Sequence, residues 1–166
     1  MKKTTYLLAM MAILLFACDP KEVKENDTAQ APSKAELDAE INTVKSHMKK
    51  YKETLESLDV TESYALFTED SEVLEQGKIE GTYRDYIANH IGPELGHFSS
   101  FTFSEYEIEV ILDLPYAFTT ESYVYNIVLK EDDRKVERKA TATSILKKIN
   151  EEWKIIKTHS SSRAKK

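Results

Sequence analysis

The feature that most constrains the fold is a pair of β-rich segments near the C-terminus, residues 136–146 and 153–162. β-Branched residues are frequent in both segments, and Asn150 between them tolerates the left-handed backbone of a tight turn, so the pattern predicts an antiparallel hairpin. Small or apolar residues alternate with polar ones along the first arm, which gives it one dry face that another element must cover. The residues of that face are Val136, Ala140, Ala142, Ser144 and Leu146.

Composition limits the classes of function. The chain has 166 residues, of which 41% are hydrophobic, which is enough for one domain with an ordinary core. Its formal net charge is −6, and removing residues 1–17 with Lys2 and Lys3 makes it about −8, so a nucleic-acid partner is not expected. The single cysteine, Cys18, can form neither an internal disulfide nor a multi-thiolate metal site.

The N-terminus has the pattern of a secretory signal. Lys2 and Lys3 precede a short apolar run, Tyr6–Phe16, which is too short to span a bilayer. The run ends in Leu-Phe-Ala-Cys at 15–18, which resembles the lipobox of bacterial lipoproteins. This resemblance implies a signal peptide at 1–17 and a diacylated Cys18 that anchors the chain to a membrane. The expected location is the bacterial cell envelope, on its periplasmic or surface face; the choice between inner and outer membrane stays open.

Residues 18–33 are predicted to be the lipidated cysteine followed by a flexible tether. The stretch is polar, contains two prolines and shows no periodicity, so it cannot bury enough surface to fold. Such a chain reaches roughly 20 Å. The folded domain is expected at 34–162, and residues 163–166 are expected to be a basic tail.

Three helices are predicted before the long strands. Ser33 and Glu36 form a capping box at the start of a long helix, and Asp59 begins a second, short one. A third helix begins after Thr82, with Asp85 three residues on, and Gly92-Pro93 ends or kinks it. The long helix carries one apolar stripe, formed by Leu37, Ile41, Val44, Met48, Tyr51, Leu55 and Leu58.

The strand pattern completes an α+β layout. A short strand is expected at 72–76, and long strands at 101–112 and 116–129 precede the final hairpin. The sum predicts three N-terminal helices packed on a curved antiparallel sheet made of a short strand and a four-stranded meander. The long helix is expected to cover the dry face of the last hairpin.

Several blocks resemble the NTF2-like superfamily, in particular its SnoaL-like and DUF4440-type members. They are Leu66–Gly77, Gly81–Tyr83, Pro115–Ala117 and Trp153–Ser161, and the likeness covers about residues 36–162. The resemblance implies a cone whose open end is a pocket. Ketosteroid isomerase, polyketide cyclases and dehydratases use this pocket for catalysis, while other members only bind or assemble. Pairing through the outer face of the sheet is common among them, which implies a homodimer.

The resemblance and the residue types suggest a set of site residues. His159, Glu75 and Tyr123 are the catalytic candidates, as acid/base and oxyanion groups. The face on which His159 lies depends on the final turn: a two-residue connection places it toward the core, whereas one bulged residue places Thr158 there instead. The expected ligand-binding residues are Tyr51, Tyr64, Tyr86, Tyr125, Ser144, Thr158 and Arg138.

No metal or cofactor is expected, because His47, His90, His97 and His159 show no metal-ligand spacing. The leading hypothesis is therefore non-catalytic binding of a small apolar or amphipathic ligand, or of a partner, in the pocket. One alternative is a cyclase, isomerase or dehydratase that acts on a small organic molecule. Another is a dimeric structural accessory of an envelope assembly. Titratable groups in hydrogen-bond contact inside the pocket would favour the enzyme, and a purely apolar pocket would favour binding.

Overall fold

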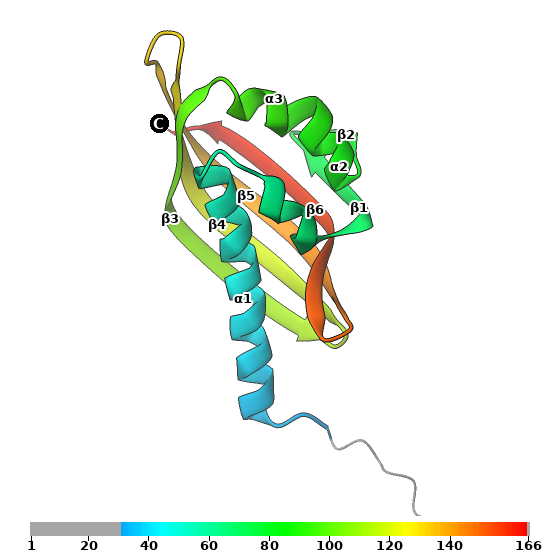
Figure 1. Ribbon diagram of the computed structural model, residues 1–166. Helices are drawn as coiled ribbons and strands as arrows, with labels where there is room; N and C mark the ends of the chain where they lie inside the picture. The colour runs from blue at the N-terminus through cyan, green and yellow to red at the C-terminus, as the bar shows by residue number, and fades with distance from the viewer. Residues whose placement is uncertain (1–30, 166) are drawn as a thin grey trace, which may run out of the picture. The chain divides into compact units, whose positions relative to one another are not determined.

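A computed structural model describes residues 31–165, so the predicted signal peptide, Cys18 and most of the tether lie outside the described residues. The long helix α1, Lys34–Glu56, begins at the predicted capping box: Ser33 accepts a hydrogen bond from the Glu36 amide, and the Glu36 carboxylate accepts one from Ser33. Such caps contribute about 1 kcal/mol to helix stability. The helix lies across the concave face of one curved sheet (Figure 1).

The sheet has six strands in the order β2-β1-β6-β5-β4-β3. Long antiparallel strands form most of it, as predicted, but β1 runs parallel to β6, so the sheet is mixed and the expectation of a purely antiparallel sheet was wrong. After β2 the chain passes through the helical segment and through β3, β4 and β5. It then returns as β6, which lies beside β1 and runs in the same direction. The bounds are β1 Phe67–Glu75, β2 Lys78–Gly81, β3 Phe98–Asp113, β4 Tyr116–Leu129, β5 Lys135–Ile149 and β6 Glu152–Ala164.

The helices also differ from the expectation of three packed helices. The second predicted helix is a single 3-10 segment, η1 (Thr61–Leu66), because the chain turns into β1 immediately after it. Strand β2 was not predicted. β6 continues through Ala164, opposite Arg138, into the segment expected to be a tail.

The third predicted helix is a composite of α2 (Tyr83–Tyr86), the π-helical turn η2 (Ile87–Ile91) and α3 (Gly92–Leu95). Pro93 has no amide hydrogen to donate to the preceding turn. The Gly92 amide donates to the Ile87 carbonyl, five residues back, which is the hydrogen bond of a π-helical turn. A Cβ atom at Gly92 would collide with that carbonyl oxygen, so only glycine fits. Gly92-Pro93 therefore changes the winding of this helix without ending it.

Two bulges determine which side chains lie on the concave face. In β3 the register shifts between Ser104 and Glu107, and Glu105 takes a left-handed conformation with φ of 51°. In β6 the register shifts opposite Leu146. As a result, the next inward-facing residue after Ile155 is Thr158, three positions further along the strand. The connecting turn is two residues, Asn150 and Glu151, both with positive φ.

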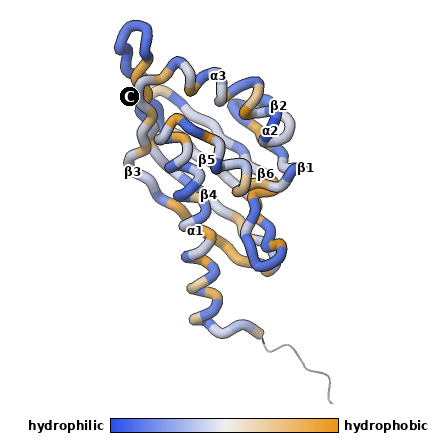
Figure 2. The backbone as a smooth tube through the Cα atoms, in the orientation of Figure 1, coloured by the Kyte–Doolittle hydropathy of each residue, from blue (hydrophilic) through white to orange (hydrophobic). Residues whose placement is uncertain are grey.

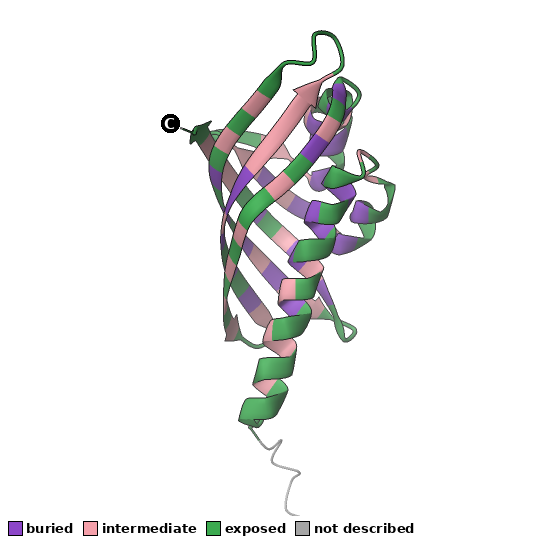
Figure 3. Cartoon of the chain, turned by 90° about the vertical axis from the view of Figure 1, so that its left-hand side faces the viewer, coloured by how far each residue is buried: buried purple, intermediate pink, exposed green. Residues whose placement is uncertain are grey.

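The core fills the space between α1, the composite helix and the concave face. Buried residues lie where helices and sheet meet, and the outer sheet face is largely exposed (Figure 3). Helix α1 is hydrogen-bonded to the β5–β6 hairpin through Glu40. This carboxylate accepts hydrogen bonds from the Trp153 indole at 2.9 Å and the Lys148 ammonium at 2.6 Å. Hydrophilic residues gather in the β4–β5 loop, away from this core (Figure 2).

The exposed outer face carries few large apolar residues, among them Ile111 and Phe118, which are paired in the sheet register. The homodimer implied by the resemblance stays a prediction. Among residues 31–165, no helix is both long and apolar enough to cross a membrane.

Candidate functional site

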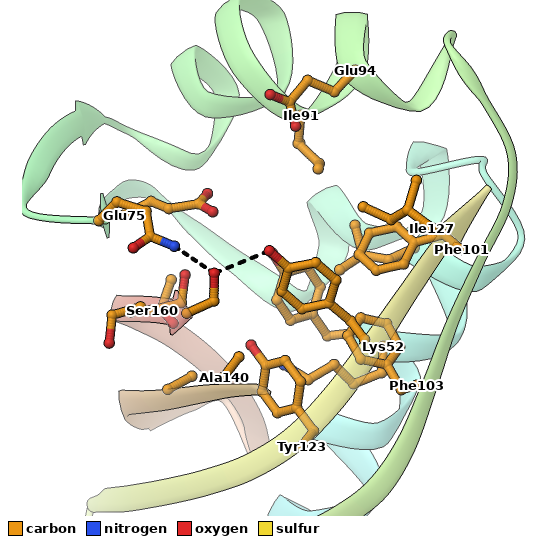
Figure 4. Close-up of a pocket in the computed structure, with 18 of the residues that line it drawn as sticks. Lys52, Glu75, Ile91, Glu94, Phe101, Phe103, Tyr123, Ile127, Ala140 and Ser160 are labelled. Carbon is orange, nitrogen blue, oxygen red and sulfur yellow. Dashed lines mark hydrogen bonds between the residues drawn. The ribbon is translucent and has the colours of Figure 1, made fainter. Parts of the chain in front are cut away.

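A pocket of about 90 Å³ opens between α1, the composite helix and the concave face of the sheet (Figure 4). It is smaller than the engineered apolar cavity of about 150 Å³ that holds benzene, but it is open on one side, so a ligand can extend into its mouth. Aromatic and aliphatic side chains form most of the wall. They include Leu55, Val73, Ile91, Phe98, Phe101, Phe103, Ile127, Ala140 and Ala142.

A carboxylate and a phenol meet inside the pocket. The Tyr86 hydroxyl donates to Oε2 of Glu75 at 2.7 Å, and both residues line the cavity. Burial, followed by the nearby Glu75 charge, raises the pKa of Tyr86 well above its usual value, so this phenol remains a hydrogen-bond donor at neutral pH. Glu75 keeps further lone pairs with which to accept a proton or a hydrogen bond from a ligand.

Further carboxylates surround His90 at the rim. Its Nδ1 lies 3.2 Å from Glu80 Oε1, and its Nε2 lies 3.4 Å from Glu94 Oε1 and 4.0 Å from Glu75 Oε2. The pKa of Glu94 is raised overall. Burial raises it most, the charges of Glu75 and Glu80 add to this, and the neighbouring His90 offsets only part of it. Glu94 also lines the pocket, so two carboxylates border the cavity.

A buried lysine lies on the opposite side of the pocket from Glu94 (Figure 4). The Lys52 side chain is 8% exposed, and its Nζ lies 3.3 Å from Oε1 of Glu121, which is 1% exposed. The same oxygen accepts a hydrogen bond from the Tyr106 hydroxyl at 2.7 Å. Burial lowers the pKa of Lys52, but the Tyr123 oxygen and the Glu121 carboxylate outweigh it and raise that pKa overall, so the side chain is an ammonium.

Hydroxyl groups form a third polar edge of the pocket. Ser162 Oγ accepts hydrogen bonds from Gln76 at 2.6 Å and Arg138 at 2.8 Å. With both lone pairs used, it donates its own hydrogen to the Tyr125 hydroxyl, 3.0 Å away. The Tyr125 hydrogen is then left for a ligand, because Tyr125 lines the cavity. Ser160 and Thr158 also line this edge.

The structure brings together only part of the predicted set. Glu75, Tyr123, Tyr51, Tyr86, Tyr125 and Thr158 line the pocket. His159 does not: it is exposed and lies on the outer face, because the bulge in β6 turns Thr158 inward instead. The expectation that His159 serves this pocket is therefore wrong.

Three other predicted binding residues lie outside the wall of the pocket. Tyr64 is 37% exposed and packs beside the Arg84 guanidinium. Ser144 is buried and shares a hydrogen bond of 2.8 Å with Thr158. Arg138 contacts the cavity only indirectly, through Ser162.

Sequence reasoning missed Lys52, Glu94 and Glu121. A signal was present for two of them. Lys52 falls on the buried face of α1, four residues after Met48 and three before Leu55, and Glu121 occupies an inward position between Thr119 and Tyr123 on β4. Charged residues at such positions are rarely buried unless paired, so each one predicts a buried partner of opposite charge. Among residues 31–165, no group of three or more acidic, histidine or cysteine side chains is arranged to hold a metal ion.

Solved structures of known proteins share this architecture. An NTF2-like superfamily protein from Salmonella enterica serovar Typhimurium superimposes with a TM-score of 0.70 at 17% identity, covering 78% of this chain and 94% of that one. The chain has the NTF2-like fold. This NTF2-like domain is also similar to a ketosteroid isomerase-like protein from Erwinia carotovora atroseptica, with a TM-score of 0.65 and 15% identity over 76% of this chain and 98% of that one.

A third similar structure is the hexachlorocyclohexane dehydrochlorinase LinA-type3 from Novosphingobium barchaimii LL02. Its TM-score is 0.63 at 14% identity, over 81% of this chain and 92% of that one. Identities this low establish the fold and leave the chemistry to the residues of the pocket. The sequence itself matches no protein-family model and no curated protein.

Proposed function

We propose that this NTF2-like domain binds a small, mostly apolar organic molecule that carries a polar group. The observation that supports this most is the composition of the cavity wall, in which aromatic and aliphatic side chains surround a few converging donors and acceptors. Cavities of this kind are typical small-molecule sites, where apolar contact provides affinity and the polar groups fix orientation. The free Tyr125 hydrogen and the Glu75 carboxylate are the orienting groups of this cavity.

The test measures the binding of acetophenone, a compact aromatic molecule with one polar atom, from the chemical-shift changes that it causes in the NMR spectrum of the protein. Ala142→Leu fills the cavity from β5 and is expected to weaken binding at least about tenfold by excluding the ring. Thr143→Leu is the matched control, since its side chain is exposed on the other face of the same strand. Equal binding by the two variants, or no binding to the unmodified chain, would overturn the proposal.

A specific contact favours a second candidate function, proton transfer. Glu75 lies in the cavity with the Tyr86 hydroxyl at 2.7 Å, so a carboxylate base is held in place beside a bound ligand. The similar structures include a protein named as a dehydrochlorinase and one named as ketosteroid isomerase-like. In this alternative Glu75 removes a proton from a carbon next to the polar group of the ligand.

Deuterium exchange separates the two candidates. In D₂O, an active base would accelerate exchange of the methyl hydrogens of acetophenone, which ¹H NMR measures as loss of the methyl signal. Glu75→Gln keeps an acceptor for Tyr86 but removes the base, so it should abolish the acceleration and preserve binding. If the unmodified chain binds acetophenone without accelerating exchange, binding without turnover is the function.

We also propose that the domain acts at a membrane face, anchored through lipid on Cys18. The support is the sequence pattern of residues 1–18, which lie outside the described part of the chain. Mass spectrometry of membrane fractions should find the chain beginning at a diacylated Cys18, and Cys18→Ser should release it from the membrane. Recovery of an unlipidated chain from the membrane fraction would contradict the anchor.

A further inference from the structure

The least expected group in the cavity is Lys52. Its ammonium is buried and lies on the side of the pocket away from Glu94, over the ring of Tyr123 at 4.6 Å, with Tyr51 and Phe103 at 5.3 and 5.6 Å. An ammonium has three donors. Among residues 31–165 its one carboxylate neighbour is Glu121 at 3.3 Å, the Tyr123 hydroxyl is a second polar neighbour, and aromatic faces surround it otherwise, so one of the three donors is left for a ligand. Aromatic faces attract the charge but satisfy a donor only weakly.

We infer that Lys52 is the subsite for an acceptor oxygen of the ligand, and that this oxygen belongs to a neutral carbonyl group. The inference rests on the binding function proposed above and narrows its ligand class to apolar ketones, aldehydes and related carbonyl compounds. The carbonyl oxygen accepts a hydrogen bond from the ammonium, while the apolar remainder contacts the aromatic wall.

The charges of the site favour a neutral acceptor over a carboxylate. Glu121 already compensates Lys52, so the pair adds no net charge to the cavity. Glu75 and Glu94 border the same space. A ligand carboxylate would add a further negative charge where the dielectric is low, and its repulsion would offset what it gains at Lys52. A carbonyl accepts the same hydrogen bond without that repulsion.

The geometry also separates this subsite from the hydroxyl edge. Tyr125 and Ser162 lie on the sheet near Gln76, whereas Lys52 reaches the cavity from α1. The carbonyl oxygen of a ligand therefore accepts a hydrogen bond from Lys52 of α1. A polar substituent elsewhere on the ligand contacts the hydroxyl groups that the strands contribute. Glu121 acts on the ligand only through Lys52, as a positioning residue.

The test compares three probes that share a phenyl ring. Acetophenone has the carbonyl, α-methylstyrene replaces C=O by C=CH₂ with nearly the same shape, and benzoate carries an anionic acceptor. In the unmodified chain, acetophenone should bind about tenfold more tightly than α-methylstyrene, the effect of one hydrogen bond to a charged donor. Benzoate should bind more weakly than acetophenone.

The variant Lys52→Met/Glu121→Gln removes both charges together, which avoids leaving an unpaired buried carboxylate. It should bind α-methylstyrene as the unmodified chain does, and lose the preference for acetophenone. Failure of all three probes to bind the unmodified chain would overturn the binding proposal and this inference together. Binding without a carbonyl preference, a preference that persists in the double variant, or tightest binding of benzoate would overturn this inference alone.

Discussion

The Tyr86 hydroxyl, from α2, donates to the Glu75 carboxylate, from β1, at 2.7 Å inside the cavity. This contact gives a stability test. Glu75→Leu leaves the Tyr86 hydroxyl without its acceptor and should lower the free energy of unfolding by about 1–3 kcal/mol. Glu75→Gln keeps an amide oxygen for that hydrogen and should cost clearly less. Denaturant unfolding of the two variants measures the difference, and equal losses would show that the contact does not stabilise the fold.

The ion pair of Lys52 and Glu121 should behave as a unit. Lys52→Met leaves the Glu121 carboxylate buried without its counter-charge, and the free energy of unfolding should fall by about 3–5 kcal/mol. Adding Glu121→Gln removes the stranded charge and keeps an acceptor for Tyr106, so the double variant should recover a large part of that loss. A double variant no more stable than Lys52→Met would refute the coupling.

Gly92 is expected to be indispensable to the composite helix. Ala at this position would place Cβ against the Ile87 carbonyl oxygen and should cost about 3 kcal/mol through the forced backbone shift. Gly77→Ala is the control, because its added Cβ meets open space and only the positive φ of 83° opposes it, a penalty of about 1 kcal/mol. Thermal unfolding that ranks the two variants the other way would contradict the π-turn geometry.

His47 should make stability depend on pH. Its Nε2 donates to the Leu66 carbonyl at 3.0 Å, and burial holds the pKa of His47 below the ordinary histidine value of 6.5. The unfolded chain therefore takes up a proton below pH 6.5 that the folded chain does not, so stability is lost as pH falls. Relative to His47→Gln, the unmodified chain should lose up to about 1.4 kcal/mol per pH unit in that window. Parallel pH profiles of the two chains would contradict this.

Much of the fold was predictable because local signals agreed with one another. The capping box at Ser33, the stripe on α1 and the alternation in β5 each set one element and its buried face. The turn at Asn150 was also correctly placed. The parallel pairing of β1 with β6 was not predictable, because it depends on where the chain returns after α3 and no local residue pattern encodes it.

The candidate site was harder to predict, because a single bulged residue reverses which side chains face inward. His159 lies outside for this reason, and Thr158, Ser160 and Ser162 line the cavity instead. The charge of Lys52 on a buried helix face was visible in the sequence. Its partner on β4 could be assigned only once the helix was placed on the sheet.

The central claim is that the cavity between α1, the composite helix and the sheet holds the ligand. Intermolecular nuclear Overhauser effects between α-methylstyrene and the methyl groups of the chain test it most directly. We predict contacts to Ile91, Ala140 and Ala142, which line the cavity. Contacts confined to exposed Ile111 and Leu114, or no contacts at all, would contradict it.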